Sequence, residues 1–294
     1  HWGVAGAAIA TVLAQLISTI ACFFYAFLKY PDLRLHREDF AITRQDLSQH
    51  IIQGVPLGLQ FSVLAIGVIV MQSVVVKFDM QDGLMVSSAA QNGFGAANKL
   101  NTLTMTPINA LGTALTSFAA QNLGAGQHER IRKGSLQALV IMLVIAGLSV
   151  GVGLLLMMGG TYLHIFLSAD KVTAETIRYG DTFLRVDYAM YIFLGGIFVM
   201  RNCDQGIGRA AFVLGAGAAE LIARIAVCML LPAAIAGGEV SAAARPLAFY
   251  ALCAADPAAW IAADIVLIIP FLRNILRQDY SYLYGDRHHK HAKA

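Results

Sequence analysis

Long apolar runs recur along the whole chain, separated by short polar stretches. Seven of them hold about 20 or more largely uncharged residues, the length that an α-helix needs to cross a ~30 Å hydrocarbon core. Helices are expected because lipid offers no partner for open backbone groups, and the ten-residue alternation of membrane strands does not appear. The predicted spans are Val4–Leu28, Ile51–Val76, Val86–Ala120, Leu136–Met158, Ile177–Met200, Phe212–Ala236 and Ala254–Leu272. The pattern therefore predicts an all-α integral membrane protein with seven transmembrane helices.

Composition supports the same class. Of 294 residues, 57% are hydrophobic and 13% are charged, and the mean hydropathy is +0.64. A soluble domain has about a quarter of its residues charged. The net charge of +3 is too small to indicate a nucleic-acid partner. The high hydropathy indicates that the helices are surrounded by lipid. The four cysteines share no metal or redox spacing, and we expect no cofactor and no metal site.

Lysine and arginine collect in alternate loops, which predicts the orientation. By the positive-inside rule the richer side is cytoplasmic, so His1 lies outside and Ala294 inside. The predicted inner set is Lys29, Arg34, Arg37, Arg44, Arg130, Arg132, Lys133, Arg201, Arg209, Arg273, Arg277, Arg287, Lys290 and Lys293, and the outer set is Lys77, Lys171, Arg178 and Arg245.

The longest loop divides one leading span from a block of six. It reads PDLRLHREDFAITRQDLSQH, with charges of both signs and few apolar residues, which is typical of a linker with an interfacial piece. The predicted organisation is a leading helix over 1–28, a cytoplasmic linker over 29–50, a six-helix lobe over 51–272 and a basic cytoplasmic tail over 273–294.

One predicted span is unusually polar. Its Asn and Thr residues are spaced 4, 4, 3, 4 and 3, which places them along one side of a helix. Such a stripe should turn away from lipid. It can line a wet cavity or hydrogen-bond to a neighbouring helix, and its five-turn length favours the cavity. Pro107 is expected to kink the helix near mid-span. The stripe consists of Asn98, Thr102, Thr106, Asn109, Thr113 and Thr116.

A few ionisable residues lie within the spans, where they are costly and usually face inward. Glu220 and Arg224 are four residues apart and can pair directly. A structural ion pair is favoured over a proton or cation carboxylate. Asp264 has no partner nearby in the sequence and is a candidate ion site. Lys99 is a candidate gating charge, although snorkelling or pairing within the bundle is favoured.

A second group of charges begins the fifth span. Arg178, Asp181 and Arg185 have the spacing of a charge ladder at the outer mouth, either as a vestibule or as a simple surface ladder. Asp187 is expected to point elsewhere.

Several stretches resemble the multidrug and toxic compound extrusion (MATE) transporters. The resemblance covers His1 to about Arg277. The stretch that is most similar runs from GAANKL to PINALGTALTSFAAQNLGAG and resembles the family's eighth helix and the loop after it. Three further stretches resemble its sixth, seventh and twelfth helices: GVAGAAIATVLAQ, GVPLGLQFSV and PAAWIAADIVL. A fourth, RNCDQGIGRAAFVLGAGAAELIAR, is similar to the Arg-Asn-x-x-Gln-Gly-x-Gly … Glu-x-x-x-Arg run common in bacterial members.

The resemblance implies twelve helices in two six-helix lobes related as parallel repeats. This chain would then supply helix six and the second lobe, with the N-terminal lobe missing. The implied function is export of small cationic or amphipathic compounds by antiport with Na⁺ or H⁺ through alternating access. The implied location is the plasma membrane of a bacterium.

The sequence departs from the family's patterns of ion coupling. No acidic residue occurs between Gln60 and Met71, where some members have one. The coupling site is therefore not placed. Asn202 and Gln205 can equally cap the inner end of the fifth span. The polar cavity candidates are Gln60, Asn98, Thr102, Thr106, Asn109, Thr113, Asn202 and Gln205.

Three other functions remain open from the sequence. A related flippase for lipid-linked sugars would need a basic cavity, for which Lys99, Arg185 and Arg224 are available. A seven-helix receptor and a non-transporting membrane scaffold are the others. An enzyme is not expected, because no nucleophile–base constellation, phosphate loop or metal-ligand helix is evident.

Overall fold

The computed structural model describes residues 3–31, 36, 41, 43–244 and 246–281. Its helices are α1 (Gly3–Lys29), α2 (Arg44–Lys77), α3 (Ala89–Gly124), α4 (His128–Met157), α5 (Thr161–Phe166), α6 (Ala174–Ala189), α7 (Tyr191–Gly206), α8 (Ala210–Ala236), α9 (Pro246–Cys253) and α10 (Ala255–Pro270). A π-helix, η5 (Phe271–Leu276), continues α10, and a two-stranded hairpin joins Met80–Gln81 to Leu84–Met85. The predicted all-α membrane fold is confirmed. Of the charges used for orientation, Arg34, Arg37, Arg245, Arg287, Lys290 and Lys293 lie outside the described residues.

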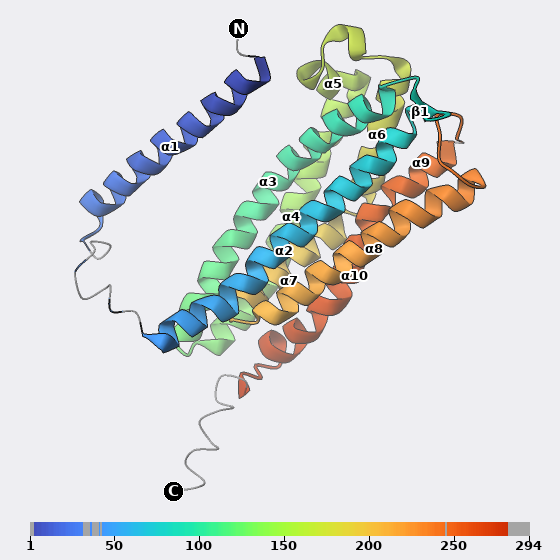
Figure 1. Ribbon diagram of the computed structural model, residues 1–294. Coiled ribbons are helices and arrows are strands. Elements are labelled where there is room, and N and C mark those ends of the chain that lie inside the picture. Colours follow the sequence, from blue (N-terminus) through green and yellow to red (C-terminus); the bar gives the residue numbers. More distant parts are fainter. Residues whose placement is uncertain (1–2, 32–35, 37–40, 42, 245, 282–294) are drawn as a thin grey trace, which may run out of the picture. The chain divides into compact units, whose positions relative to one another are not determined.

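The chain forms two compact units, residues 1–51 and 52–294. The first contains α1, an uninterrupted apolar helix whose Phe23 and Phe27 rings pack 4.3 Å apart. The second contains a bundle in which α3, α4, α7 and α8 run side by side (Figure 1). Within it α3 packs against α4, α6 and α7, while α10 packs against α7 and α8.

Five helical segments are long and apolar enough to cross a membrane: 5–29, 44–77, 128–166, 210–236 and 246–276. The pair α6 and α7 together make a sixth, bent by 56° at the break between them. The polar helix α3 has 36 residues but is not among them. It nevertheless runs beside the other helices of the bundle (Figure 1). The count of seven spans therefore stays a prediction.

The break between α6 and α7 corrects the prediction of one continuous helix over Ile177–Met200. The amide of Met190 donates to the carbonyl of Asp187, three residues earlier, and the amide of Phe193 donates to Met190 in the same way. These tighter turns redirect the chain. The predicted kink at Pro107 does not interrupt α3, which continues through it as one helix.

Asp79 joins the hairpin to the start of α3. Its carboxylate accepts the backbone amides of Ala90 at 3.0 Å and Gln91 at 2.9 Å. These are first-turn amides that have no partner within the helix, and a carboxylate there also complements the helix dipole. Asp79 is buried, so this cap fixes where α3 begins in the bundle.

The helices α3 and α6 cross closely where two glycines meet. A Cβ atom at Gly93 would collide with the carbonyl oxygen of Thr176 and lie 3.0 Å from the amide nitrogen of Gly180. Both neighbours are backbone atoms, which cannot rotate away. A Cβ at Gly95, half a turn along the same helix, would meet nothing within 4 Å. The crossing therefore depends on the absence of a side chain at Gly93.

We expect Gly93→Ala to destabilise the protein by about 1–3 kcal/mol, the usual cost of overpacking. Gly95→Ala is the matched control and should be neutral or slightly stabilising, because alanine favours a helix. Thermal unfolding in detergent measures both changes. Equal melting temperatures for the two variants would contradict the close crossing.

Candidate functional site

A cluster of buried charges lies between α7, α8 and α10. Glu220 accepts hydrogen bonds from Arg201 at 2.8 Å and from Arg224 at 3.2 Å. Arg224 also pairs with Asp256 at 2.9 Å. No side chain of the four is more than 14% exposed. Buried charges persist in such surroundings only when paired and hydrogen-bonded, and here each carboxylate has a guanidinium partner.

The predicted pair of Glu220 and Arg224 is present, but two of its partners were missed. Arg201 was predicted to lie in an inner loop, whereas α7 continues past it and holds its guanidinium against Glu220. Asp256 lies in the first turn of α10. A signal for Asp256 was available, because an acidic residue just inside a helix start is a common stabilising feature.

The cluster borders a cavity of about 300 Å³. Five helices contribute to its lining: α2, α3, α7, α8 and α10. One wall is apolar, and it includes Leu64, Val68 and the indole of Trp260. The polar side chains that line it are Asn98, Asn101, Arg201, Glu220, Arg224 and Asp256.

Asp187 points away from the outer charge ladder, as predicted, and bonds in the core to Asn101, which lines this cavity. It is fully buried, and one carboxylate oxygen accepts from the side-chain amide of Asn101 at 2.9 Å. Its other oxygen has no hydrogen-bond partner among the described residues. Tyr191 donates to Asn101 at 2.8 Å and lies 2.8 Å from the hydroxyl of Thr104. Asn101 and Thr104 of α3 therefore bond to residues on both sides of the break between α6 and α7: Asn101 bonds to Asp187 and Tyr191, and Thr104 bonds to Tyr191.

Sequence reasoning missed Asn101 and Thr104 because they lie beside the predicted stripe. They belong to a second face of α3, which the structure buries. That face repeats Leu100, Thr104, Ile108 and Leu115 at helical spacing. Polar residues interrupting an otherwise apolar helical face were the available signal.

Most of the predicted stripe lies on an exposed face of α3. Thr102, Thr106, Asn109 and Thr113 are exposed, and the three threonine hydroxyls bond to carbonyl oxygens four residues earlier. These four residues do not line the charged cavity, and among the described residues their side chains form no hydrogen bond to another helix. Asn98 is the one stripe residue at the charged cavity. Cavity lining by the rest stays a prediction.

The inner end of the stripe joins two helices instead. Thr116 donates to the side-chain oxygen of Asn202 on α7 at 2.8 Å. The helices approach closely there, since a Cβ at Gly112 would lie 2.5 Å from the Asn202 amide. The alternative prediction, that the stripe bonds to a neighbouring helix, is therefore confirmed for Thr116 and Asn202. Gln60 is buried against Gly217 of α8, and Gln205 is half-buried at the end of α7.

The outer charge ladder is only partly present. Asp181 accepts from the hydroxyl of Tyr162 at 3.2 Å and pairs with exposed Arg185 at 3.9 Å. Arg178 instead pairs with Glu175 at 3.9 Å, because Glu175 lies one turn before it. The predicted contact between Arg178 and Asp181 is wrong.

Lys99 and Asp264 form no ion pair with the cluster in the part of the chain that the structure describes, although Asp264 is close enough to Arg201 and Glu220 to interact with their charges. The ammonium of Lys99 is exposed and lies 5.7 Å above the Phe166 ring. Asp264 is half-buried in α10, and Gly196 of α7 leaves room for its carboxylate. One oxygen of Asp264 is buried without a hydrogen-bond partner in the described structure.

The charge balance of the site favours a cation. Glu220 and Asp256 pair with the two guanidinium groups of Arg201 and Arg224, and a third carboxyl group, Asp187, lies near Arg224 and Asp256. A surplus carboxylate in a low-dielectric site attracts a metal ion, a proton or a cationic ligand. A positive charge would therefore be electrostatically favoured at this cavity.

Comparisons with known proteins agree with this architecture. Residues 67–230 match the MatE family, over more than half of the chain. A probable multidrug resistance protein, YpnP of Bacillus subtilis (strain 168), is 30% identical over 217 residues, which cover 72% of this chain and 44% of that protein. A FAD transporter of Shewanella oneidensis is 30% identical over 141 residues, covering 47% of this chain and 29% of the transporter.

Two solved structures share the fold at 18% sequence identity. One is an outward-facing multidrug resistance MATE family transporter of the MOP superfamily, with a TM-score of 0.72, and the other is a MATE in complex with MaL6, with a TM-score of 0.70. Each match covers 91% of this chain, and 55% and 56% of those chains respectively. The chain therefore spans about half the length of these structures and less than half of the curated relatives.

Proposed function

The chain belongs to the MatE family of membrane transporters, and on that premise we propose that it exports small cationic or amphipathic compounds by antiport with Na⁺ or H⁺. The observation that carries the proposal is the charged cavity among α2, α3, α7, α8 and α10, with its surplus carboxylate. An ionisable cluster inside an apolar helical bundle is costly, and such clusters commonly mark ion or substrate pathways.

The exposed stripe on α3 supports a water-filled path at the surface of this unit. Four polar side chains, Thr102, Thr106, Asn109 and Thr113, occupy one face of a helix whose neighbours are apolar. Facing lipid, the Asn109 amide would lack hydrogen-bond partners, which favours a wet environment. We propose that this face lines the substrate path, opposite a second lobe of the same protein.

Alternating access would use the break between α6 and α7. A ligand shifts a conformational equilibrium only by binding one state better than the other. Asp187 lies three residues before Met190, where the helices break, and bonds to α3, so its charge can favour one arrangement of these helices. Binding of the coupling cation would remove that charge and favour the other arrangement.

The proposed location is the plasma membrane of a bacterium, with the C-terminus in the cytoplasm. The start of α4 and the end of the segment that follows α10 lie at the same end of the bundle (Figure 1). Arg130, Arg132 and Lys133 are in the first turns of α4, and Arg273 and Arg277 are in or directly after η5. Gln278 donates to Glu129 there, which joins the two segments. This concentration of positive charge is typical of the inner side.

The flippase alternative is less favoured. It would need a basic cavity, but carboxylates outnumber guanidinium groups at the site described above. Lys99 and Arg185 are exposed and do not line the charged cavity.

Ethidium efflux tests the proposed transport. A bacterial host that lacks its own efflux pumps, expressing the full-length gene, should retain less ethidium than the same host with an empty vector. Collapse of the sodium or proton gradient by a selective ionophore should restore retention, because antiport has no other energy source. Efflux that continues after both gradients are collapsed would overturn the antiport mechanism.

A further inference from the structure

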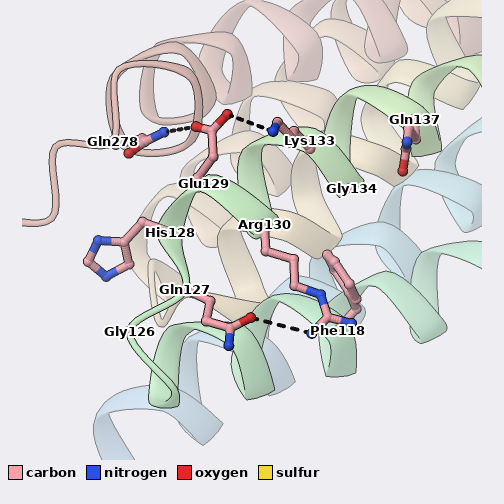
Figure 2. A pocket seen from close by; sticks show the side chains of 10 residues that line it. All are labelled: Phe118, Gly126, Gln127, His128, Glu129, Arg130, Lys133, Gly134, Gln137 and Gln278. Atoms are coloured by element: carbon pink, nitrogen blue, oxygen red, sulfur yellow. Dashed lines mark hydrogen bonds and ion pairs between the residues drawn. The ribbon is translucent and has the colours of Figure 1, made fainter.

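A second pocket lies where α3 is followed by α4, at the end of the unit that is opposite the hairpin. Its volume is about 890 Å³. Figure 2 shows the first turns of α4 along one side and Gln278, from the segment after η5, across from them. The polar side chains of the pocket include Gln127, Arg130, Lys133, Gln137 and Gln278.

The pocket presents cations whose charge is only partly balanced. Two basic residues that line it, Arg130 and Lys133, lie beside one acid, Glu129. Glu129 is already engaged by Gln278, by Arg132 at 3.3 Å and by Lys133 at 3.7 Å. The contact of Arg130 is with a neutral group, the side-chain oxygen of Gln127 at 3.3 Å. No carboxylate pairs with Arg130 in the part of the chain that the structure describes.

The same helix continues from the pocket as an exposed apolar face. Gln137, Val140 and Val144 follow Lys133 at intervals of three or four residues, so they lie on one side of α4. The span from Lys133 to Val144 is about 16 Å long at 1.5 Å per residue. The exposed apolar side chains below the pocket are Leu136, Val140, Ile141, Val144 and Leu148.

We propose that this pocket binds the phosphate headgroup of an anionic phospholipid, whose acyl chains lie along α4. A guanidinium and an ammonium one turn apart suit a phosphate, with arginine able to donate two parallel hydrogen bonds. The amides of Gln127, Gln137 and Gln278 suit the hydroxyl groups of a headgroup. Basic pockets at the cytoplasmic membrane surface are a recurring form of lipid recognition. The apolar face on the same helix selects a lipid over a soluble phosphate.

The bound headgroup would connect the α3–α4 turn to the end of the bundle. Gln278 reaches the pocket because the segment that carries it is held in place. The His128 ring stacks on Tyr280 with centroids 4.1 Å apart, and Arg273 donates to Asp279 at 2.7 Å. Hydrogen bonds from Ser281 and Arg273 lower the pKa of Asp279, so this contact persists at neutral pH. The proposal does not depend on what the protein transports.

Lipid titration of the purified full-length protein tests this site. Native mass spectrometry would follow binding of phosphatidylglycerol, phosphatidylcholine and inorganic phosphate to delipidated protein. We expect phosphatidylglycerol to bind more tightly than phosphatidylcholine. The double variant Arg130→Gln/Lys133→Gln should bind phosphatidylglycerol about thirty-fold more weakly, and Arg130→Gln alone about five-fold, from the usual contribution of one basic residue.

Arg132→Gln is the matched control, because it removes an equal charge from the same helix turn but does not line the pocket. It should change phosphatidylglycerol affinity by less than about two-fold. Equal weakening by Arg132→Gln would mean diffuse attraction and would overturn the site. Unchanged affinity in Arg130→Gln would overturn it too. Inorganic phosphate that displaces the lipid and binds as tightly would assign the pocket to a soluble anion instead.

Discussion

Replacing Arg224 with methionine is expected to destabilise the protein by about 3–5 kcal/mol, the largest loss of stability that we predict. The side chain of Arg224 is 7% exposed and pairs with Glu220 and Asp256. Methionine fills similar volume without charge. Two buried carboxylates would then lose a partner, and only Glu220 would keep another, in Arg201.

This penalty comes from the carboxylates left behind rather than from the ion pair itself. A buried pair is often no more stabilising than an apolar pair of the same size, whereas one unpaired buried charge is costly. Arg224→Lys should therefore lose less than Arg224→Met, because it keeps the charge. Arg224→Lys should still lower the stability, since a single ammonium group replaces a planar guanidinium group that pairs with two carboxylates.

Thermal unfolding of purified variants in detergent would measure these effects. Arg178→Met is the matched control: it removes an arginine that is 53% exposed and pairs with Glu175 at 3.9 Å. Exposed pairs contribute about 1 kcal/mol or less. If Arg224→Met and Arg178→Met melt at the same temperature, the buried cluster does not have the energetic role assigned to it.

The sequence predicted the fold well because apolar length alone identifies helices in a membrane. The pairing of Glu220 with Arg224 was also predictable, since both lie on one helix, four residues apart. The break at Met190 was not, because no proline or glycine lies at it and the residues on both sides of it, 188–194, are all apolar or aromatic. Helix breaks of this kind are set by tertiary contacts such as the bond between Asn101 and Asp187.

The candidate site was harder to predict because its members come from different helices. Periodicity showed that Asn98 and Thr102 share one face of α3, but it could not show which face the bundle buries. Asp187 and Asp256 are 69 positions apart in the sequence, and the pairing of Asp256 with Arg224 crosses between two helices. A single sequence contains no direct signal for such contacts.

Asp187→Asn is expected to leave the fold intact and to reduce the efflux that the ion gradient drives. The substitution keeps the volume of the side chain and an oxygen that can accept from the amide of Asn101. It removes the charge that we propose the coupling cation to neutralise. We expect gradient-driven ethidium efflux to fall by at least roughly ten-fold, because a neutral amide gives the cation little differential affinity for the two states.

Two measurements separate this role from a structural one. The melting temperature of Asp187→Asn should stay within a few degrees of the parent protein, whereas a structural carboxylate would lower it. Asp170→Asn, an exposed aspartate before α6, controls for the loss of one negative charge and should transport normally. An Asp187→Asn protein that still exports ethidium with full gradient dependence would show that the coupling cation binds elsewhere. Asp264 would then be the next carboxylate to test, because one of its oxygens is also buried without a hydrogen-bond partner among the described residues.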